Sequence, residues 1–198
     1  QQYKYPPETI LSATFFYKNT EEFYRFYRNK MLCLDAKPNT AHLKLAEFEK
    51  KGHLAAIVTQ NIDGLHQAAG SRTVYELHGS VHRNYCRKCG RLYDAKWILE
   101  SSGVPECEDC GGLVKPDVVL YEEGLDNATI QGAVKAINEA DVLIVGGTSL
   151  NVYPAAGFLR YFQGSRLVIM NRDATSADSS ADLIIRDKIG EALGTIEV

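Results

Sequence analysis

The sequence predicts an α/β protein with a parallel sheet and a small cysteine-bearing module inserted into it. Short apolar runs alternate with helical stretches of ten or more residues, as in strands joined by crossover helices. Four of the five cysteines form two Cys-x-x-Cys pairs in one loop-rich stretch. The 198 residues correspond to about 1.3 domains of average size, so one domain with a small appendage is expected.

Composition and charge exclude several classes of protein. Hydrophobic residues make up 45% and charged residues 24%, which are globular values and not those of a disordered chain. The net charge of −3 argues against a dedicated nucleic-acid binder, which needs a basic surface. The longest apolar runs, 142–145 and 167–170, are far shorter than the roughly 20 residues of a membrane span. Residues 1–7 lack the features of a signal sequence, and we expect a soluble cytoplasmic protein.

Residues 8–53 are expected to be helical. Apolar residues recur at three- and four-residue spacings in three segments, 8–18, 20–34 and 40–51. Thr20 is suited to cap the second helix, because Glu21 and Glu22 follow in the first turn, where the helix dipole favours negative charge. Gly52 is a common stop signal for the third helix.

Strands and helices then alternate. Short apolar runs predict strands at 54–59, 141–147, 167–171 and 183–185. The run 141–147 is the clearest buried strand, and the continuous run 54–59 is typical of a strand covered on both faces. Helices fit at 129–140 and 154–162.

Residues 81–115 interrupt this alternation. They contain both cysteine pairs and several glycines, and they hold too little apolar surface for a core of their own. We therefore expect this stretch to be a small module inserted between two halves of the α/β domain.

The cysteine pairs predict a structural zinc site. The pairs Cys86/Cys89 and Cys107/Cys110 are separated by seventeen residues, a spacing at which four thiolates can surround one tetrahedral Zn²⁺. Four sulfur ligands leave no position for water, so the metal would stabilise the fold and not take part in chemistry. The alternative is that these cysteines are redox-active or incidental. The fifth, Cys33, lies in an apolar stretch and is expected to be a small buried hydrophobe.

Polar side chains follow the first predicted strand. Gln60, Asn61 and Asp63 come directly after the run 54–59, and ligands of open parallel sheets bind at the carboxyl ends of the strands. These amides and this carboxylate could hold a polar heterocycle or a sugar. The alternative is that Asn61 or Asp63 only caps the next helix.

His78 is the histidine best placed for chemistry. It precedes a Gly-Ser turn and lies near the Asn61–Asp63 loop in sequence, and imidazole suits removal of a proton from a hydroxyl group. His42, His53 and His82 are expected to be structural.

Two further loops carry polar groups at strand ends. Gly147, Thr148 and Ser149 follow the strand 141–147 and precede a helix, so their backbone and hydroxyls could bind phosphate or ribose. Asn171 ends the next strand. Alone, a Gly-Gly-Thr-Ser sequence is a weak signal, but together the loops suggest a nucleotide site.

These motifs, in this order, resemble those of the sirtuin family of NAD-dependent protein deacylases, in a bacterial-type member. The resemblance extends from about residue 40 to the end of the chain. The matching pieces are Thr59-Gln60-Asn61-Ile62-Asp63-Gly64-Leu65-His66, Leu77-His78-Gly79-Ser80, the four cysteines, Lys115-Pro116-Asp117-Val118-Val119, Gly147-Thr148-Ser149 and Asn171-Arg172.

The resemblance implies a Rossmann-type NAD-binding domain over 1–80 and 116–198, with a helical insertion near 8–53, and a small four-cysteine zinc-binding domain over 81–115. It implies His78 as general base, assisted by Asn61. The cofactor-binding residues would be Gln60, Asn61, Ile62, Asp63, Gly147, Thr148, Ser149, Asn171 and, as a weaker match, Lys188. The acetylated-lysine peptide would bind in strand addition beside Val118, Tyr121, Asn151, Val152 and Tyr153.

The implied reaction is NAD-dependent deacetylation of protein lysines. The acetyl oxygen displaces nicotinamide from the ribose, and His78 removes a proton from a ribose hydroxyl that then attacks the acyl carbon. The products would be lysine, nicotinamide and O-acetyl-ADP-ribose. The cofactors would be NAD as co-substrate and one structural Zn²⁺; no nucleic acid or membrane partner is implied.

One departure from the family pattern concerns the first residues. The family opens with a strand, a glycine-rich turn and an Asp-Phe-Arg loop, which would help to hold the pyrophosphate, and none is found here. We therefore expect the chain as written to bind NAD poorly and its full-length parent to be active.

Acyl preference is expected to favour acetyl. Family members that prefer succinyl or malonyl groups carry a Tyr and an Arg three residues apart in the second helical segment. Tyr24 matches the Tyr, but Tyr27 stands at the Arg position, and Arg25 and Arg28 would point about 100° away on a helix.

Two other functions remain open from the sequence. One is a mono-ADP-ribosyltransferase on the same scaffold, which shares the first chemical step. The other is a zinc-ribbon adaptor without catalysis, which fits the cysteine module but neither the net charge nor the polar loops.

Overall fold

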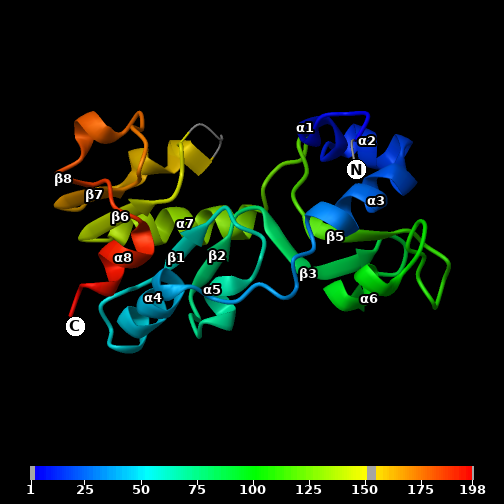
Figure 1. Ribbon diagram of the computed structural model, residues 1–198, viewed down its shortest axis with the longest axis horizontal. Coiled ribbons are helices and arrows are strands. Elements are labelled where there is room, and N and C mark those ends of the chain that lie inside the picture. Colours follow the sequence, from blue (N-terminus) through cyan, green and yellow to red (C-terminus); the bar gives the residue numbers. More distant parts are fainter. Residues whose placement is uncertain (1–2, 151–154, 198) are drawn as a thin grey trace. The chain divides into compact units, whose positions relative to one another are not determined.

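The computed structural model describes residues 3–150 and 155–197 (Figure 1). The chain forms two compact units. Unit 1 comprises Gln1–Ala36, Asn61–Gly64 and His78–Leu125, and unit 2 comprises Lys37–Gln60, Leu65–Leu77 and Asp126–Val198. The chain therefore passes repeatedly between the units, and each unit is assembled from segments that are distant in sequence.

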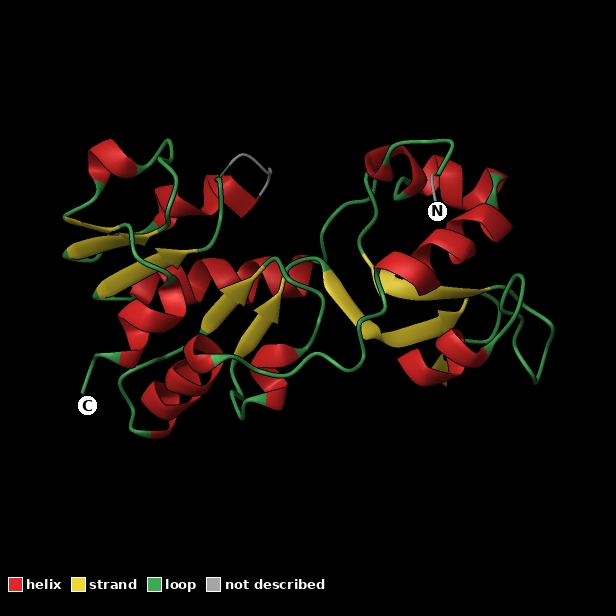
Figure 2. Cartoon of the chain, in the orientation of Figure 1, coloured by secondary structure: helices red, strands yellow, loops and turns green. Residues whose placement is uncertain are grey.

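Unit 1 combines helices with an antiparallel sheet. Its helices are α1 (Pro7–Ile10), α2 (Ala13–Lys18), α3 (Thr20–Lys30) and α6 (Ala95–Glu100). Its strands β3 (Gly79–Cys86), β4 (Leu92–Tyr93) and β5 (Val114–Val118) have the order β4-β3-β5. Figure 2 shows β3 and β5 as yellow arrows that run side by side. Aromatic side chains spaced three or four residues apart on α2 and α3 form its core; Phe16, Phe23, Tyr24 and Tyr27 are completely buried.

The first helical segment differs in detail from expectation. The stretch 8–18 is two helices, because the Ser12 hydroxyl accepts a hydrogen bond from Phe15 N at 3.2 Å and starts α2. Thr20 does not cap α3, so that prediction was wrong: Asn19 stands at the N-cap position without a side-chain cap hydrogen bond, and the Thr20 hydroxyl donates to Phe16 O. Gly52 does follow the end of α4, with a positive φ of 81°.

Cys33 is exposed, which contradicts the expectation of a buried residue. The reason is that α3 ends at Lys30, three residues earlier than Cys33. The helical periodicity that would have turned this side chain inward therefore does not reach it.

Unit 2 contains the parallel strands, in two sheets. Strands β1 (Ile57–Thr59) and β2 (Val74–Glu76) pair in one, and β6 (Val142–Gly146), β7 (Arg166–Met170) and β8 (Leu183–Ile185) form the other in the order β6-β7-β8. The helices are α4 (Thr40–Lys50), α5 (Leu65–Ala68), α7 (Asn127–Glu139) and α8 (Ile189–Gly194), with 3₁₀ turns η1 (Ala155–Tyr161) and η2 (Asp178–Ser180). The expected parallel pairing is confirmed.

Two strands of unit 2 are less buried or shorter than expected. Val142 and Ile144 of β6 are 51% and 39% exposed. The expectation of a fully buried strand fails because β6 lies at the end of the order β6-β7-β8, whereas Ile169 on the central strand is completely buried. The strand expected at 54–59 is reduced to β1, and the helix expected at 154–162 is the 3₁₀ turn η1.

Helix α4 covers part of the core of unit 2. Its residues Ala41 and Phe48 form one buried cluster with Met170 of β7 and Leu193 of α8. This cluster connects the 40–50 helix to the end of β7, where polar loop residues begin.

The contact-defined units do not follow the expected ranges, because helices α1–α3 group with the cysteine module in unit 1. The assignment of 81–115 as the zinc-binding domain therefore stays a prediction.

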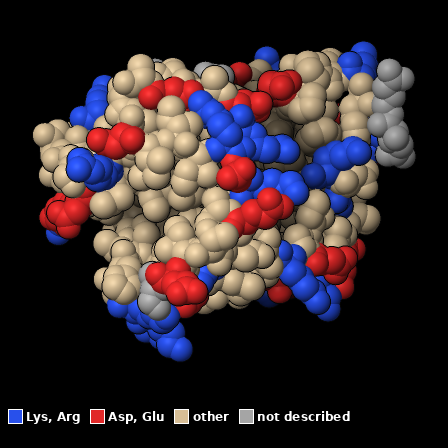
Figure 3. Space-filling view, turned by 60° about the vertical axis from the view of Figure 1, so that its left-hand side comes forward, with Lys and Arg blue, Asp and Glu red and all other residues tan. Residues whose placement is uncertain are grey.

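No helix among the described residues is both long and apolar enough to cross a membrane. On the face drawn in Figure 3, positive and negative side chains are interspersed.

Candidate functional site

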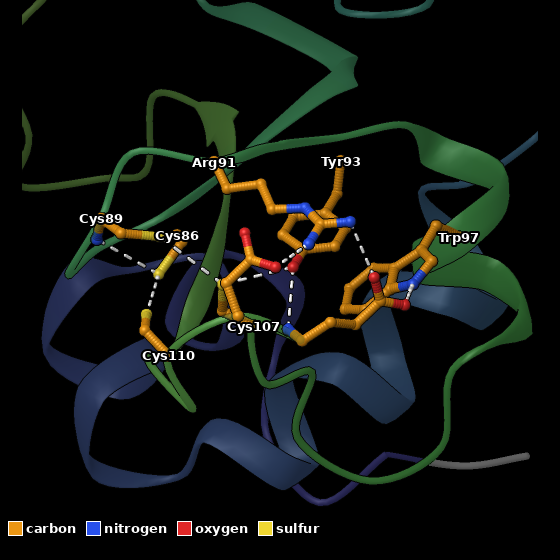
Figure 4. Close-up of polar contacts among 9 residues, drawn as sticks. Cys86, Cys89, Arg91, Tyr93, Trp97, Cys107 and Cys110 are labelled. Atoms are coloured by element: carbon orange, nitrogen blue, oxygen red, sulfur yellow. Dashed lines mark hydrogen bonds and ion pairs between the residues drawn. The ribbon is translucent and has the colours of Figure 1, made fainter.

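The four paired cysteines converge in unit 1. Cys86 comes from the end of β3, and the sulfur atoms of Cys86, Cys89, Cys107 and Cys110 all lie within 4.8 Å of one another (Figure 4). The distances from Cys86 Sγ to Cys110 Sγ and from Cys89 Sγ to Cys107 Sγ are both 3.5 Å. Four thiolates at about 2.3 Å from a tetrahedral Zn²⁺ would be about 3.8 Å apart, so the cluster fits this ion.

Backbone and side-chain donors point at the sulfur atoms. The amides of Lys88 and Cys89 donate to Cys86 Sγ at 3.4 and 3.5 Å. The Tyr93 hydroxyl donates to Cys107 Sγ and, as the largest cause, lowers the pKa of the Cys107 thiol to about 6. Such donors favour the thiolate form that binds metal.

Gly112 allows the loop with Cys107 and Cys110 (the second knuckle) to approach the loop with Cys86 and Cys89 (the first knuckle). A Cβ atom at this position would lie 2.8 Å from Cys86 Sγ and 3.3 Å from Cys110 Sγ. Only glycine leaves room for the sulfurs here, which supports a shared ion at the centre of the four cysteines.

In unit 2, two of the polar residues expected at strand ends contact each other. Gln60 follows β1 and Thr148 follows β6, and the Gln60 amide donates to Thr148 Oγ1 at 3.5 Å. The Thr148 hydroxyl also accepts a hydrogen bond from Leu150 N at 3.2 Å. Leu150 has a positive φ of 56°, an uncommon conformation for this residue that often marks functional loops. Ser149, between them, is exposed.

A cavity of about 410 Å³ opens at the ends of β6 and β7. It unites three expected cofactor residues, Gly147, Asn171 and Lys188. The other polar residues of its lining, Arg172, Asp173 and Asp187, were not among the expected cofactor-binding residues. The complete lining is Gly147, Met170, Asn171, Arg172, Asp173, Asp187, Lys188 and Ile189. In the sequence, the charged residues that directly follow β7 and precede α8 were the signal that could have indicated this lining.

Arg186 holds the loop that carries Asn171. Its guanidinium donates to Asn171 O and Asp173 O, both at 2.9 Å, and pairs with the Asp178 carboxylate. The Asn171 amide donates to Asp173 O at 3.0 Å. Lys188 stands at the N-cap position just before α8 and pairs with Glu191 at 2.9 Å, with both side chains mostly exposed.

In unit 1, the Asn61–Gly64 loop is attached to the start of β3. Val81 N donates to Ile62 O at 3.0 Å, and His82 Nε2 lies 2.9 Å from Asp63 O. His82 therefore supports this loop, in agreement with a structural role. His78 directly precedes β3, and its carbonyl accepts a hydrogen bond from Val119 N at 3.0 Å.

Two of the expected substrate residues lie beside this strand end. Val118 pairs with Gly79 in the β3–β5 ladder. The Tyr121 backbone is already paired, since Tyr121 N donates to Leu11 O and Ala13 N donates to Tyr121 O, each at 3.0 Å, whereas the Tyr121 side chain is 53% exposed. Asn151, Val152 and Tyr153 lie outside the described residues.

Comparisons with known proteins decide the family. The profile of the Sir2 family matches residues 2–154. The chain belongs to this family. It is 61% identical to an NAD-dependent protein deacetylase of Clostridium acetobutylicum, over 98% of this chain and 80% of that protein.

Solved Sir2 structures share the Rossmann-type fold. A structure of Sir2 with p53 peptide and NAD⁺ has a TM-score of 0.87 and 40% identity, covering 98% of this chain and 83% of that one. A second, with the inhibitor EX-527, 2′-O-acetyl-ADP-ribose and deacetylated p53 peptide, has a TM-score of 0.87 and 39% identity, covering 93% and 82%. The α/β class expected from the sequence is thereby confirmed for this Sir2-family chain.

Proposed function

We propose that this protein is an NAD-dependent protein deacetylase, which transfers the acetyl group of a protein lysine to ADP-ribose and releases nicotinamide. The observation that carries the proposal is the cavity at the carboxyl ends of β6 and β7, lined by Gly147, Asn171 and Lys188. This is where a parallel α/β sheet binds a nucleotide. The relative from Clostridium acetobutylicum has the same activity in its name.

Unit 2 would hold the nucleotide through the residues at its strand ends. Thr148, Ser149 and the Gly147 backbone would bind phosphate and ribose, and Asn171 would bind the adenosine ribose, beside Lys188. Gln60, whose amide already contacts Thr148, would contact the nicotinamide ribose. Cleavage of the glycosidic bond of NAD, which releases nicotinamide, supplies the driving force of the reaction.

The loop after β1 and His78 would supply the groups that act on the nicotinamide end. Asp63 and the Ile62 backbone would bind the carboxamide, and Asn61 would orient an ordered water or the ribose. His78 would take the proton from the ribose hydroxyl. The attachment of the 61–64 loop to β3, which starts next to His78, supports the assignment of these residues to one site.

The peptide would bind along Val118 and Tyr121, and on its other side along Asn151, Val152 and Tyr153.

An acetyl preference is supported by the two arginines near Tyr24. Arg25 pairs with Glu22, and Arg28 donates to Ile98 O at 3.0 Å, so both guanidinium groups are engaged within unit 1. A cytoplasmic location is favoured by the four thiolates, which need a reducing compartment.

Mass spectrometry of an acetyl-lysine peptide incubated with NAD and the purified full-length protein tests the proposal. We expect loss of the acetyl group together with O-acetyl-ADP-ribose. Addition of ADP-ribose to protein would instead indicate a mono-ADP-ribosyltransferase. No change of either kind would leave the zinc-ribbon adaptor and overturn the proposal.

A further inference from the structure

Tyr93 connects the two cysteine knuckles through its hydroxyl group. The side chain stands at the end of β4 and is only 5% exposed. Its oxygen lies 3.2 Å from Cys107 Sγ and accepts a hydrogen bond from Glu108 N at 2.8 Å (Figure 4). Because a phenol has one proton and the amide occupies an acceptor position, that proton is directed at the sulfur.

This contact distinguishes Cys107 from the other three sulfurs. Among the described residues, the other side chains in hydrogen-bond contact with these sulfurs are the cysteines themselves. A hydroxyl that donates to a metal-bound thiolate stabilises its negative charge and fixes its direction, as partners of metal ligands commonly do.

The ring of Tyr93 is held in place by its neighbours. The Trp97 ring packs against it in a tilted arrangement, with 4.0 Å between centroids and 34° between the ring planes, and the Arg91 guanidinium lies 5.0 Å from its centroid. The same two residues bind the second knuckle: Arg91 pairs with Glu108 at 2.9 Å and with Asp109, and Trp97 Nε1 donates to Glu108 Oε1 at 3.0 Å. The hydroxyl therefore has little freedom to leave Cys107.

We propose that Tyr93 is a positioning residue of the zinc site, which keeps the Cys107 thiolate bound to the metal and shields it from electrophiles. The Arg91–Trp97–Glu108 contacts form a clamp that holds Tyr93 and the second knuckle together. The inference concerns retention of the metal and is independent of the proposed deacetylase activity.

The variant Tyr93→Phe removes the hydroxyl and keeps the ring. Tyr85→Phe is a matched control, because Tyr85 lies on β3 in the same module and its side chain is 38% exposed. We expect chelator-driven release of Zn²⁺, followed with a metallochromic indicator, to be about tenfold faster in Tyr93→Phe. Alkylation of the released thiols should accelerate in parallel, and Tyr85→Phe should match the unmodified protein.

Replacement of Zn²⁺ by Co²⁺ distinguishes the effect of the Tyr93 hydroxyl from that of the clamp. Loss of a donor to a thiolate raises the energy of the sulfur electrons, so the sulfur-to-Co²⁺ charge-transfer band of Tyr93→Phe should move to longer wavelength. Glu108→Gln weakens the clamp but leaves the hydroxyl, so release should be faster while the band stays in place. Release and band position in Tyr93→Phe that equal those of Tyr85→Phe would overturn the proposal, as would an equal band shift in Glu108→Gln.

Discussion

The side-chain amide of Gln60 donates a hydrogen bond to the Thr148 hydroxyl, with 3.5 Å between Nε2 and Oγ1. The two residues follow different strands, β1 and β6, whose carboxyl ends consequently approach each other within unit 2. Gly147, which lines the cavity, directly precedes Thr148 in the chain. Loops that are far apart in sequence thus supply one polar edge.

Arg186 should affect the binding of NAD more than the chemical step. Its contacts with Asn171 O, Asp173 O and the Asp178 carboxylate hold the loop around Asn171, a residue of the cavity lining. We expect Arg186→Gln to raise the KM for NAD about tenfold, because a positioning contact of this kind is worth about 1.4 kcal/mol, and to leave kcat nearly unchanged. Steady-state kinetics with an acetylated peptide measure both values.

Arg166→Gln is the matched control for this prediction. Arg166 lies at the opposite end of β7 from Asn171, and its side chain is 67% exposed. If Arg166→Gln raised the KM for NAD as much as Arg186→Gln does, the effect would come from the loss of surface charge in general.

Asp178 should make stability depend on acidic pH. The Thr175 hydroxyl, followed by Arg186, holds the pKa of this carboxyl below its usual range. Because the folded-state pKa is lower than that of the unfolded chain, about 3.9, the stabilisation is present above about pH 4 and is lost as the pH falls through the folded-state value. The melting temperature of Asp178→Asn should therefore lie below that of the unmodified protein at about pH 7 and approach it in acid.

Asp35→Asn provides the comparison, since Asp35 is exposed. Its melting temperature should follow that of the unmodified protein throughout. If the difference in melting temperature between Asp178→Asn and the unmodified protein stayed constant down to about pH 2, the link between the Asp178 pKa and stability would be contradicted.

His78 should be required for the acyl transfer. Replacement with Ala removes the proposed base, and a lost general base typically costs about 10²–10⁴-fold in rate. We expect kcat to fall by that range while ADP-ribose still binds, as measured by calorimetry. His53→Ala, at an exposed position, should keep full activity, and equal activity of the two variants would remove His78 from its role.

Gly79 should tolerate no side chain. Its φ is 74°, and a Cβ atom there would lie 1.9 Å from the Asp117 carbonyl oxygen of β5. Gly52 has a similar φ of 81° and open space around it. Gly52→Ala should therefore cost only the conformational penalty of about 1–2 kcal/mol, whereas Gly79→Ala should cost about 4 kcal/mol or more, because strand β5 must move.

Denaturant titration measures both free energies of unfolding. Equal losses in the two variants would mean that the β3–β5 ladder adjusts without cost at the residue that follows His78.

Local signals in the sequence were sufficient for much of the fold. Alternating apolar runs and helical stretches predicted the parallel strands of unit 2, and the Cys-x-x-Cys spacing predicted the cluster of four sulfurs. The errors have tertiary causes. Thr20 was expected to cap a helix, but its hydroxyl donates a hydrogen bond to the Phe16 carbonyl in the preceding helix. The apolar β6 was expected to be buried, but it lies at the end of its strand order.

The sequence by itself determined the class of the fold, the family resemblance and which four cysteines cluster, because periodicity and short motifs depend on neighbouring residues. The tertiary structure alone decided that Arg186 supports the Asn171 loop and that Tyr93 donates to Cys107. The first contact joins the Arg186 side chain to a backbone carbonyl 15 residues away, and the second joins two side chains 14 residues apart in sequence. Their formation depends on how strands and knuckles pack, a long-range property that no local pattern of residue types encodes.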